Sequence, residues 1–147
     1  MKAVIQRVSK AIVTVDGIQI SQIGFGLAIL LGIAKGDSSE LTNFLAEKIA
    51  NLRIFEDENG KMNHSLLDTG AEALVVSQFT LLGDCRKGRR PGFDKAALPN
   101  DAQMLYNEFI DKLKSLGVEV QTGRFQAEML FEIHNDGPVT FVLDTDE

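Results

Sequence analysis

The segment Leu27–Ile33 constrains the fold most, because it is apolar throughout apart from Gly32. A strand with one face in water alternates apolar and polar residues, whereas a strand covered on both faces is a continuous apolar run. The segment therefore predicts a buried central strand. It is also far too short to cross a bilayer, so we expect no membrane association.

A β-hairpin is predicted just before this strand. Ile12–Val15 and Ile18–Ile20 flank Asp16-Gly17, a dipeptide that supplies the positive φ angles of a two-residue hairpin turn. Further strands are expected from short apolar or alternating segments. These are Ala3–Val8, Arg53–Phe55, Ala73–Leu82, Val118–Thr122, Leu130–Ile133 and Val139–Leu143.

Two segments have apolar residues at helical spacing. The first begins at Gly36 or Asp37, with Glu40 three residues after Asp37 as in a capping box. The second begins at Pro99 with Asn100 as its cap, and Gly117 ends it. The apolar stripes comprise Leu41, Phe44, Leu45, Ile49 and Leu52, then Ala102, Leu105, Tyr106, Phe109, Leu113 and Leu116.

The order strands, helix, strands, helix, strands predicts the fold class. We expect one α+β domain over residues 1–147, with two main helices on a mainly antiparallel, barrel-like sheet. The chain is 44% hydrophobic and 24% charged, which is typical of a globular domain and excludes a disordered chain.

Charge and cysteine content narrow the function classes. A net charge of −6 excludes a generally basic nucleic-acid coat protein. The single cysteine, Cys85, excludes an internal disulfide and a multi-cysteine metal site, and only His64 and His134 could add imidazole ligands. We therefore expect no metal and no cofactor. A free thiol and no visible signal peptide favour a cytoplasmic protein.

A basic cluster stands out against this acidic chain. Arg86, Lys87, Arg89 and Arg90 are four of the 15 Lys and Arg residues, in the loop-like segment Gly83–Leu98. A small positive patch on an acidic body suits a compact phosphate target, because the surrounding field opposes a long footprint. A solvated loop without a ligand is the alternative.

Three further features leave alternatives open. The polar residues Ser77, Gln78 and Thr80 around Phe79 either line a site or mark a strand end in water. Thr80 as a nucleophile needs a base, and only folding could bring a histidine near it. Cys85, beside two cations, is either a reactive thiol or an inert one. Asn135–Thr140 reads as a turn between strands, with a cis Gly137–Pro138 bond allowed, and His134 as an exposed strand residue.

Taken together, the segments resemble the D-aminoacyl-tRNA deacylase family, whose bacterial type is often called D-tyrosyl-tRNA deacylase. The resemblance spans Met1–Val8 to Asp144 and includes Ala46–Phe55 and Lys87–Pro91. Its most specific motifs are Ser77-Gln78-Phe79-Thr80 and Asn135-Asp136-Gly137-Pro138-Val139-Thr140.

The resemblance implies an ester hydrolase that removes D-amino acids, and glycine, from the terminal ribose of tRNA. It also implies a homodimer in which a cis Gly137–Pro138 unit enters the other subunit's pocket and excludes L side chains. This would make the predicted turn a chiral filter, which is a steric form of selectivity.

The family's site residues carry over by motif. The resemblance places the reacting carbonyl at Ser77–Thr80, with the N–H groups of Phe79 and Thr80 on the oxyanion and the substrate's own 2′-hydroxyl assisting water. Phe125 and Met129 match residues around the terminal adenosine, and Arg7 and Gln78 match residues that brace the Gly-Pro unit. Arg86, Lys87, Arg89 and Arg90 are expected at tRNA phosphates.

Three departures and two other function classes remain. Gln126 stands where the family usually has glycine, and Gly92 replaces a common serine. A third departure is expected at Thr145–Glu147, which extend the usual end. The residues alone also allow a non-catalytic RNA-end binding protein that uses the basic loop. A thiol hydrolase acting through Cys85 is the other alternative.

Overall fold

The computed structural model describes residues 1–147, and its sheet is arranged around the long strand β1 (Lys2–Val15). β1 pairs antiparallel with β2 (Ile18–Ile23), β3 (Gly26–Gly32) and β8 (Leu130–Asp144). β6 (Glu72–Ser77) then pairs parallel with β3 and with β7 (Glu119–Thr122). The α+β class is confirmed, but the predicted mainly antiparallel sheet is a mixed one, with three antiparallel and two parallel pairings.

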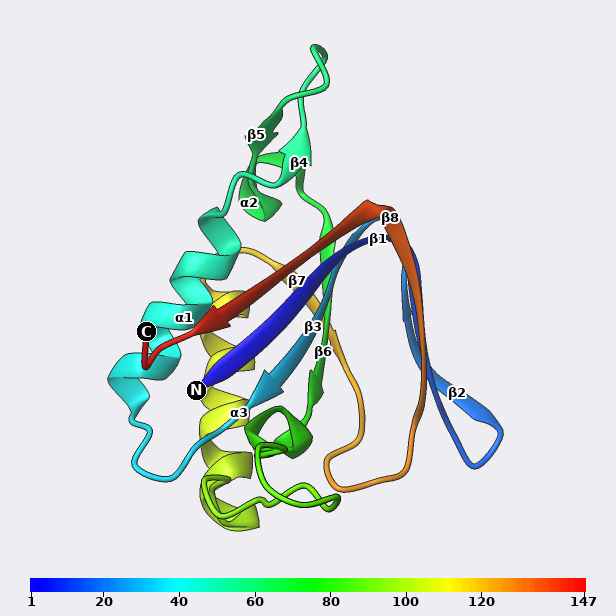
Figure 1. Cartoon of the computed structure of the whole chain (residues 1–147). Coiled ribbons are helices and arrows are strands. Elements are labelled where there is room, and N and C mark those ends of the chain that lie inside the picture. Colours follow the sequence, from blue (N-terminus) through cyan, green and yellow to red (C-terminus); the bar gives the residue numbers. More distant parts are fainter.

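The sheet curls until β2 approaches β6 and β7, so that it is nearly closed. A small apolar cluster fills the inside of the curl, with Val13, Ala28 and Leu74 among its members. The two long helices, α1 (Ser39–Asn51) and α3 (Pro99–Ser115), lie side by side against the outer surface (Figure 1). β3 is thus covered on both faces, as its apolar sequence predicts.

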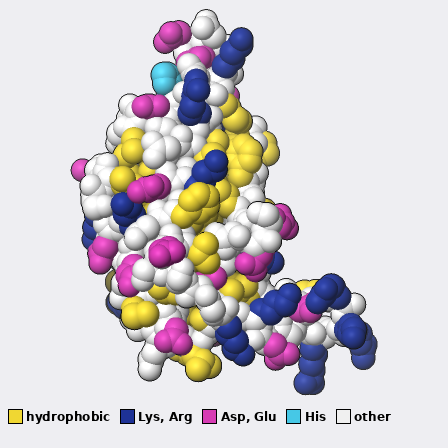
Figure 2. All heavy atoms as spheres, turned by 90° about the vertical axis from the view of Figure 1, so that its left-hand side faces the viewer, with side chains coloured by type: hydrophobic (Ala, Val, Ile, Leu, Met, Phe, Trp, Pro, Cys, Tyr) yellow, Lys and Arg dark blue, Asp and Glu magenta, His cyan; other side chains and the backbone are white.

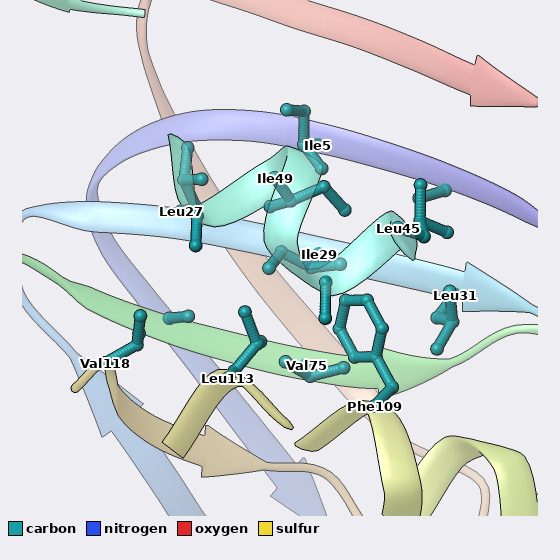
Figure 3. Packing of buried hydrophobic residues seen from close by; sticks show 14 of the residues in the cluster. Ile5, Leu27, Ile29, Leu31, Leu45, Ile49, Val75, Phe109, Leu113 and Val118 are labelled. Carbon is teal, nitrogen blue, oxygen red and sulfur yellow. The ribbon is translucent and has the colours of Figure 1, made fainter. Parts of the chain in front are cut away.

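The main core lies between the sheet and the two helices. Ile5, Ile29 and Val75 from the strands point toward Ile49 of α1 and Phe109 of α3 (Figure 3). Each Å² of apolar surface removed from water contributes about 25 cal/mol to the stability of the fold. This layer is the larger of the two apolar clusters, so it is the main source of stability.

The remaining elements are short. β4 (Phe55–Glu56) and β5 (Met62–His64) form a small hairpin, which α2 (Leu66–Thr69) follows. A 3₁₀ helix, η1 (Phe79–Leu82), follows β6. None of the helices has the length and apolarity needed to cross a membrane.

The Asp16-Gly17 hairpin is confirmed. The two turn residues have φ angles of 51° and 76°, and Val15 pairs with Ile18 directly beside them. Positive φ at both positions gives the turn the twist of the strands that it joins.

The predicted strand Ala73–Leu82 is wrong beyond Ser77, where the chain turns into η1. Gly32, at the end of β3, explains the turn. A Cβ on Gly32 would lie 3.0 Å from the Gln78 carbonyl oxygen and 2.6 Å from Leu82 Cδ2. The missing side chain therefore lets the chain after β6 cross over the end of β3.

The predicted start of the second long helix at Pro99 is confirmed, but the predicted caps of both helices are wrong. Ser38, and not Asp37, caps α1 by accepting a hydrogen bond from the Leu41 N–H. The Asp37 carboxylate instead accepts from the Ala34 N–H at 2.7 Å. α3 begins at Pro99, directly after Leu98, so Asn100 is not its cap. Phe44, which was predicted in the apolar stripe of α1, is 58% exposed and therefore does not belong to the core.

The predicted turn at Asn135–Thr140 is also wrong, because these residues lie inside β8. β8 runs along β1 on both sides of this segment, with Val8 opposite Asn135 and Gln6 opposite Thr140. The four residues between those two therefore face only Arg7 and form a bulge.

Candidate active site

A cavity of about 760 Å³ lies at the carboxyl ends of the three parallel strands. Ile33 and Lys35 follow β3, Ser77–Phe79 end β6, and residues 125–129 follow β7. Parallel strands bring these ends to one edge of the sheet, where ligand sites of parallel sheets are usually found. The loop before α3 covers the cavity from the other side, through Phe93–Leu98.

The Ser77–Thr80 motif forms part of this wall. The Gln78 N–H donates to the Leu31 carbonyl at 2.8 Å, which fixes the motif to the end of β3. The side chains of Ser77 and Gln78 are half-buried, whereas Phe79 is 57% exposed. Polar groups and an aromatic ring are thus presented together at the cavity, as the functional interpretation of the motif requires.

Thr80 does not line the cavity. Its Oγ1 accepts a hydrogen bond from the Gln78 side-chain amide, which cannot act as a base. The two histidines lie elsewhere, because His64 pairs with Phe55 in the small hairpin and the exposed His134 pairs with Lys10. Within one chain, neither histidine therefore lies beside Thr80 to act as its base.

Phe125 and Met129 also line the cavity, in the segment that links β7 to β8. Gly123 makes room for the Met129 sulfur, which lies 2.6 Å from where a Cβ on Gly123 would stand. Phe125 packs against Tyr106, whose hydroxyl donates to the Val75 carbonyl at 2.8 Å. Burial raises the pKa of Tyr106, so its phenol stays neutral and holds this part of the lining in place.

Phe93 is a further residue of the cavity, not predicted from the sequence. Its ring meets that of Phe79 edge-to-face, with 5.1 Å between the centroids. Both rings line the cavity. The signal was an aromatic residue three positions after the basic cluster, but its contact with Phe79 depends on how the loop folds back.

The Gly137–Pro138 peptide is cis, and Gly137 has a φ of 137°. Hydrogen bonds hold this bulge in place. Arg7 Nε donates to the Asp136 carbonyl at 3.0 Å, and the Val139 N–H donates to Asn135 Oδ1 at 2.7 Å. Gly137 and Pro138 are nonetheless exposed. The bulge is therefore both fixed and accessible.

Arg7 holds the bulge through its hydrogen bond to Asp136 and does not line the cavity. It is 5% exposed, and its Nη1 donates to the Ile54 carbonyl at 3.0 Å. Its Nη2 lies 3.6 Å from a Glu56 carboxylate oxygen. Arg7 thus connects the bulge to the β4–β5 hairpin.

One chain does not bring the two motifs together. Arg7 pairs with Leu27 and Ser77 with Leu31, so the motifs lie four β3 residues apart, about 13 Å along the strands. They are also separated by three strand spacings in the order β8-β1-β3-β6, about 14 Å across the sheet. A small substrate at Ser77–Phe79 cannot touch Gly137 of the same chain.

The basic cluster lies on the exposed loop between η1 and α3. Asp84 and Gly92 close this loop through two backbone hydrogen bonds of 2.7 and 2.9 Å. Arg86 binds the Asp84 carboxylate through two nitrogens at 2.8 and 2.9 Å. These hydrogen bonds hold the pKa of Asp84 well below its usual range. Cys85 is exposed here but does not line the cavity.

Solved structures share this fold over the whole chain. One, described as the c-Myc DNA unwinding element binding protein, is 45% identical and covers 99% of both chains with a TM-score of 0.93. Another, described as a probable eukaryotic D-amino acid tRNA deacylase, is only 16% identical and shows the fold alone, with a TM-score of 0.81 over 97% of both chains.

The sequence comparisons identify the family. The family model of D-Tyr-tRNA(Tyr) deacylase matches residues 4–144. A D-aminoacyl-tRNA deacylase of Clostridioides difficile is 59% identical over 99% of this chain and 97% of its own length. One from Symbiobacterium thermophilum is 53% identical over all of this chain and 97% of its own length. The chain belongs to the D-aminoacyl-tRNA deacylase family.

Proposed function

We propose that this protein hydrolyses the ester between a D-amino acid, or glycine, and the 3′-terminal ribose of tRNA. Family membership over residues 4–144 supports the reaction. The observation that carries it is the cavity at the parallel strand ends, lined by the Ser77–Phe79 motif and by Phe125 and Met129.

The cavity suits an aminoacylated nucleoside. Its volume of about 760 Å³ is within the range of small-molecule sites. Phe125 and Met129 offer an apolar surface on which an adenine can stack. The ester then lies toward Ser77 and Phe79.

The backbone at Phe79 and Thr80 supplies the oxyanion donors in this proposal. The Gln78 N–H is already bonded to Leu31, and the first bond of the 3₁₀ turn is donated by Leu81 to the Gln78 carbonyl. The two N–H groups between them have no acceptor within that turn. Each oxyanion donor contributes about 2.7–4 kcal/mol in related acyl-transfer reactions.

Water assisted by the substrate's 2′-hydroxyl is the proposed nucleophile. The Thr80 hydroxyl accepts from the Gln78 amide and has no base beside it. The reaction drawn in this way uses the RNA itself and two backbone N–H groups, so it requires no metal ion.

Chiral selection is proposed to come from a second copy of the chain. The exposed Gly137–Pro138 bulge cannot reach the cavity of its own chain, whereas in a homodimer it can enter the cavity of the other. Phe141 and Val142, exposed apolar residues just beyond the bulge, support such a contact. Backbone carbonyls there would bind the substrate's amino group and leave no space for an L side chain.

The direct test is hydrolysis of D-tyrosyl-tRNA and L-tyrosyl-tRNA by the purified protein. We expect rapid release of D-tyrosine and little release of L-tyrosine. Glycyl-tRNA should also be cleaved, because glycine has no side chain to exclude. Equal cleavage of the two tyrosyl esters, or none, contradicts the proposal.

A matched set of variants tests the oxyanion donors. Phe79→Pro removes one N–H, and Gln78 before it has a φ of −142° and a ψ of 85°, outside the helical region that a following proline disfavours. Phe79→Ala removes the same ring but keeps the N–H. We expect kcat of the proline variant to fall about 10²- to 10³-fold below that of the alanine variant. Thr80→Ala should keep most of the activity, and its complete loss in a folded protein would favour a nucleophilic threonine.

A further inference from the structure

A second concave site lies on the basic loop, which we call the basic hollow. Its volume is about 340 Å³. It is lined by Leu82, Asp84, Arg86, Lys87, Arg90, Gly92, Asp94 and Lys95. Figure 2 shows the surrounding surface: basic side chains gather on an arm at the lower edge of the molecule, at the height of the loop after η1 in Figure 1. The hollow is thus a local positive site on a chain of net charge −6.

The charges within the basic hollow are not equivalent. Arg86 is already bonded to Asp84 through two nitrogens, so these two charges cancel. Lys87, Arg90 and Lys95 remain, opposed only by Asp94. Arg89, which the sequence groups with these cations, does not line the hollow. An anion in the hollow would therefore meet three uncommitted cations.

The backbone gives the basic hollow its shape. The antiparallel bridge between Asp84 and Gly92 closes the loop at its base. Gly88, at its far end, has a φ of 67°, a conformation that other residues adopt at a cost. Lys87 and Arg90, on either side of this turn, line the hollow, whereas Arg89 does not.

The basic hollow adjoins the cavity of the candidate active site. Asp94 lines both. The Lys35 N–H donates to the Lys95 carbonyl at 2.9 Å, which joins a residue of the cavity to one of the hollow. Phe93, which directly precedes Asp94 in sequence, packs on Phe79 of the cavity. A ligand that fills the cavity and continues along this side reaches the hollow next.

We propose that the basic hollow binds a phosphodiester of the RNA strand that leads into the cavity, through Lys87, Arg90 and Lys95. The inference rests on the proposed function, because it takes the terminal nucleotide to lie at Phe125 and Met129. Phosphate contacts position a nucleic acid without reading its sequence, so the hollow sets how far the 3′ end enters. In contrast to the expectation from the sequence, Arg86, which is bound to Asp84, and Arg89, which does not line the hollow, take no part in it.

Binding of uncharged tRNA, measured by fluorescence anisotropy, tests the hollow separately from catalysis. We expect Arg90→Ala, Lys87→Ala and Lys95→Ala each to raise Kd about fivefold at low salt. Each should also lower the slope of log Kd against log salt by about 1, as for one lost phosphate contact. Arg89→Ala removes the same charge from the neighbouring position, and its Kd should stay within about twofold of the wild type.

Two further experiments identify the ligand of the basic hollow. Inorganic phosphate at concentrations that leave ionic strength matched should displace tRNA from the wild type no better than from Arg90→Ala, because the hollow takes a phosphate held by its RNA strand. With D-tyrosyl-tRNA, Arg90→Ala should raise KM and leave kcat unchanged, because the contact is remote from the ester.

The outcomes separate the two proposals. If Arg89→Ala weakens tRNA binding as much as Arg90→Ala, or if neither does, the basic hollow is overturned even when D-tyrosyl-tRNA is cleaved. If D-tyrosyl-tRNA is not cleaved, the proposed function fails, and the binding series still decides whether the hollow holds RNA. Specific competition by inorganic phosphate at the hollow would mark it as a site for a free anion and overturn the RNA assignment.

Discussion

Gln126 has a φ of 62°, in the left-handed region that favours glycine. It lies in the segment of Phe125 and Met129 and lines the cavity. The glycine that the family resemblance leads us to expect here would suit this backbone conformation. In this chain a side chain occupies the position and carries a conformational cost of about 1–2 kcal/mol.

Gln126→Gly should therefore raise the free energy of unfolding by up to about 1 kcal/mol, after the greater freedom of an unfolded glycine is subtracted. Urea denaturation measures it. Gln121→Gly in β7 is the matched control, and it should lower the stability by about 0.5–1 kcal/mol because glycine weakens a strand. Two changes of the same sign would show that φ at Gln126 does not limit stability.

Gly137 is a second residue with a positive φ, and here the absence of a side chain matters. A Cβ there would lie 2.7 Å from Val139 Cγ2 and 3.1 Å from Arg7 Nη2, at a φ of 137°. Gly137→Ala must therefore move the bulge or Arg7. We expect kcat/KM for D-tyrosyl-tRNA to fall about 100-fold, since a displacement of about 1 Å has that effect on a positioned group.

Gly24→Ala is the control for this variant, because a Cβ at Gly24 meets nothing within 4 Å. It should keep the wild-type rate and the wild-type preference for the D ester. A Gly137→Ala protein that is folded, fully active and fully selective would remove the bulge from the proposed filter.

At the scale of elements, Asp57 organises the turn of the β4–β5 hairpin. Its Oδ1 accepts hydrogen bonds from the Asn59 N–H at 2.8 Å and the Lys61 N–H at 3.0 Å. The bond from Lys61 is the main cause that lowers the pKa of Asp57 below its ordinary value of 3.8. Because the folded pKa is the lower one, the carboxylate stabilises the turn above pH 3.8, and this is lost as the pH falls through the folded pKa.

Amide chemical shifts followed by NMR during an acid titration test this. The Asn59 and Lys61 amide protons should titrate together, with a midpoint below 3.8. In Asp57→Asn that shared titration should vanish, because the amide oxygen still accepts but does not ionise. A wild-type midpoint at or above 3.8 would contradict the hydrogen-bonded carboxylate.

Elements with local causes could be predicted from the sequence. The Asp16-Gly17 hairpin depends on two adjacent residues, and the stop of α3 before Gly117 on one, whose φ is 101°. The end of β6 could not be predicted, since it depends on Gly32, which lies 45 positions before Ser77 in sequence. The Asn135–Thr140 segment has the composition of a turn, but pairing with β1 on both sides keeps it inside β8.

Some residues of the candidate site could likewise be predicted from the sequence, and others could not. Motif resemblance identified Ser77, Gln78, Phe79, Phe125 and Met129, which the fold gathers around one cavity. Phe93 and Lys95 were missed, because their place depends on the return of the loop from Asp84 to Gly92. Arg90 lines the basic hollow and the adjacent Arg89 does not, a difference that depends on the folded loop and not on the run of basic residues.

At the scale of the whole molecule, the proposal that two chains share each site can be tested with a hybrid dimer. One chain carries Phe79→Pro and the other Gly137→Ala, with different tags so that the hybrid can be purified. One of its two sites then combines an intact backbone at Phe79 with an intact bulge. We expect about half of the wild-type activity, from one intact site in two.

The two parent proteins, each carrying one variant in both chains, are the controls and should be nearly inactive. If every site were built from one chain, both sites of the hybrid would be damaged. An inactive hybrid made of two folded chains would therefore exclude the shared site.

The pairing of β1 with β8 also bears on how the protein is made. Lys2 lies opposite Asp144 and Gln6 opposite Thr140, so the first strand of this sheet pairs with the last one in sequence. Contacts this distant in sequence fold slowly, and an unpaired strand edge is prone to association with other chains. During synthesis, the edge of β1 that pairs with β8 stays unpaired until β8 has been made. The β1–β8 pairing is completed only after residue 144 has been synthesised, so this edge is open to association with other chains until then.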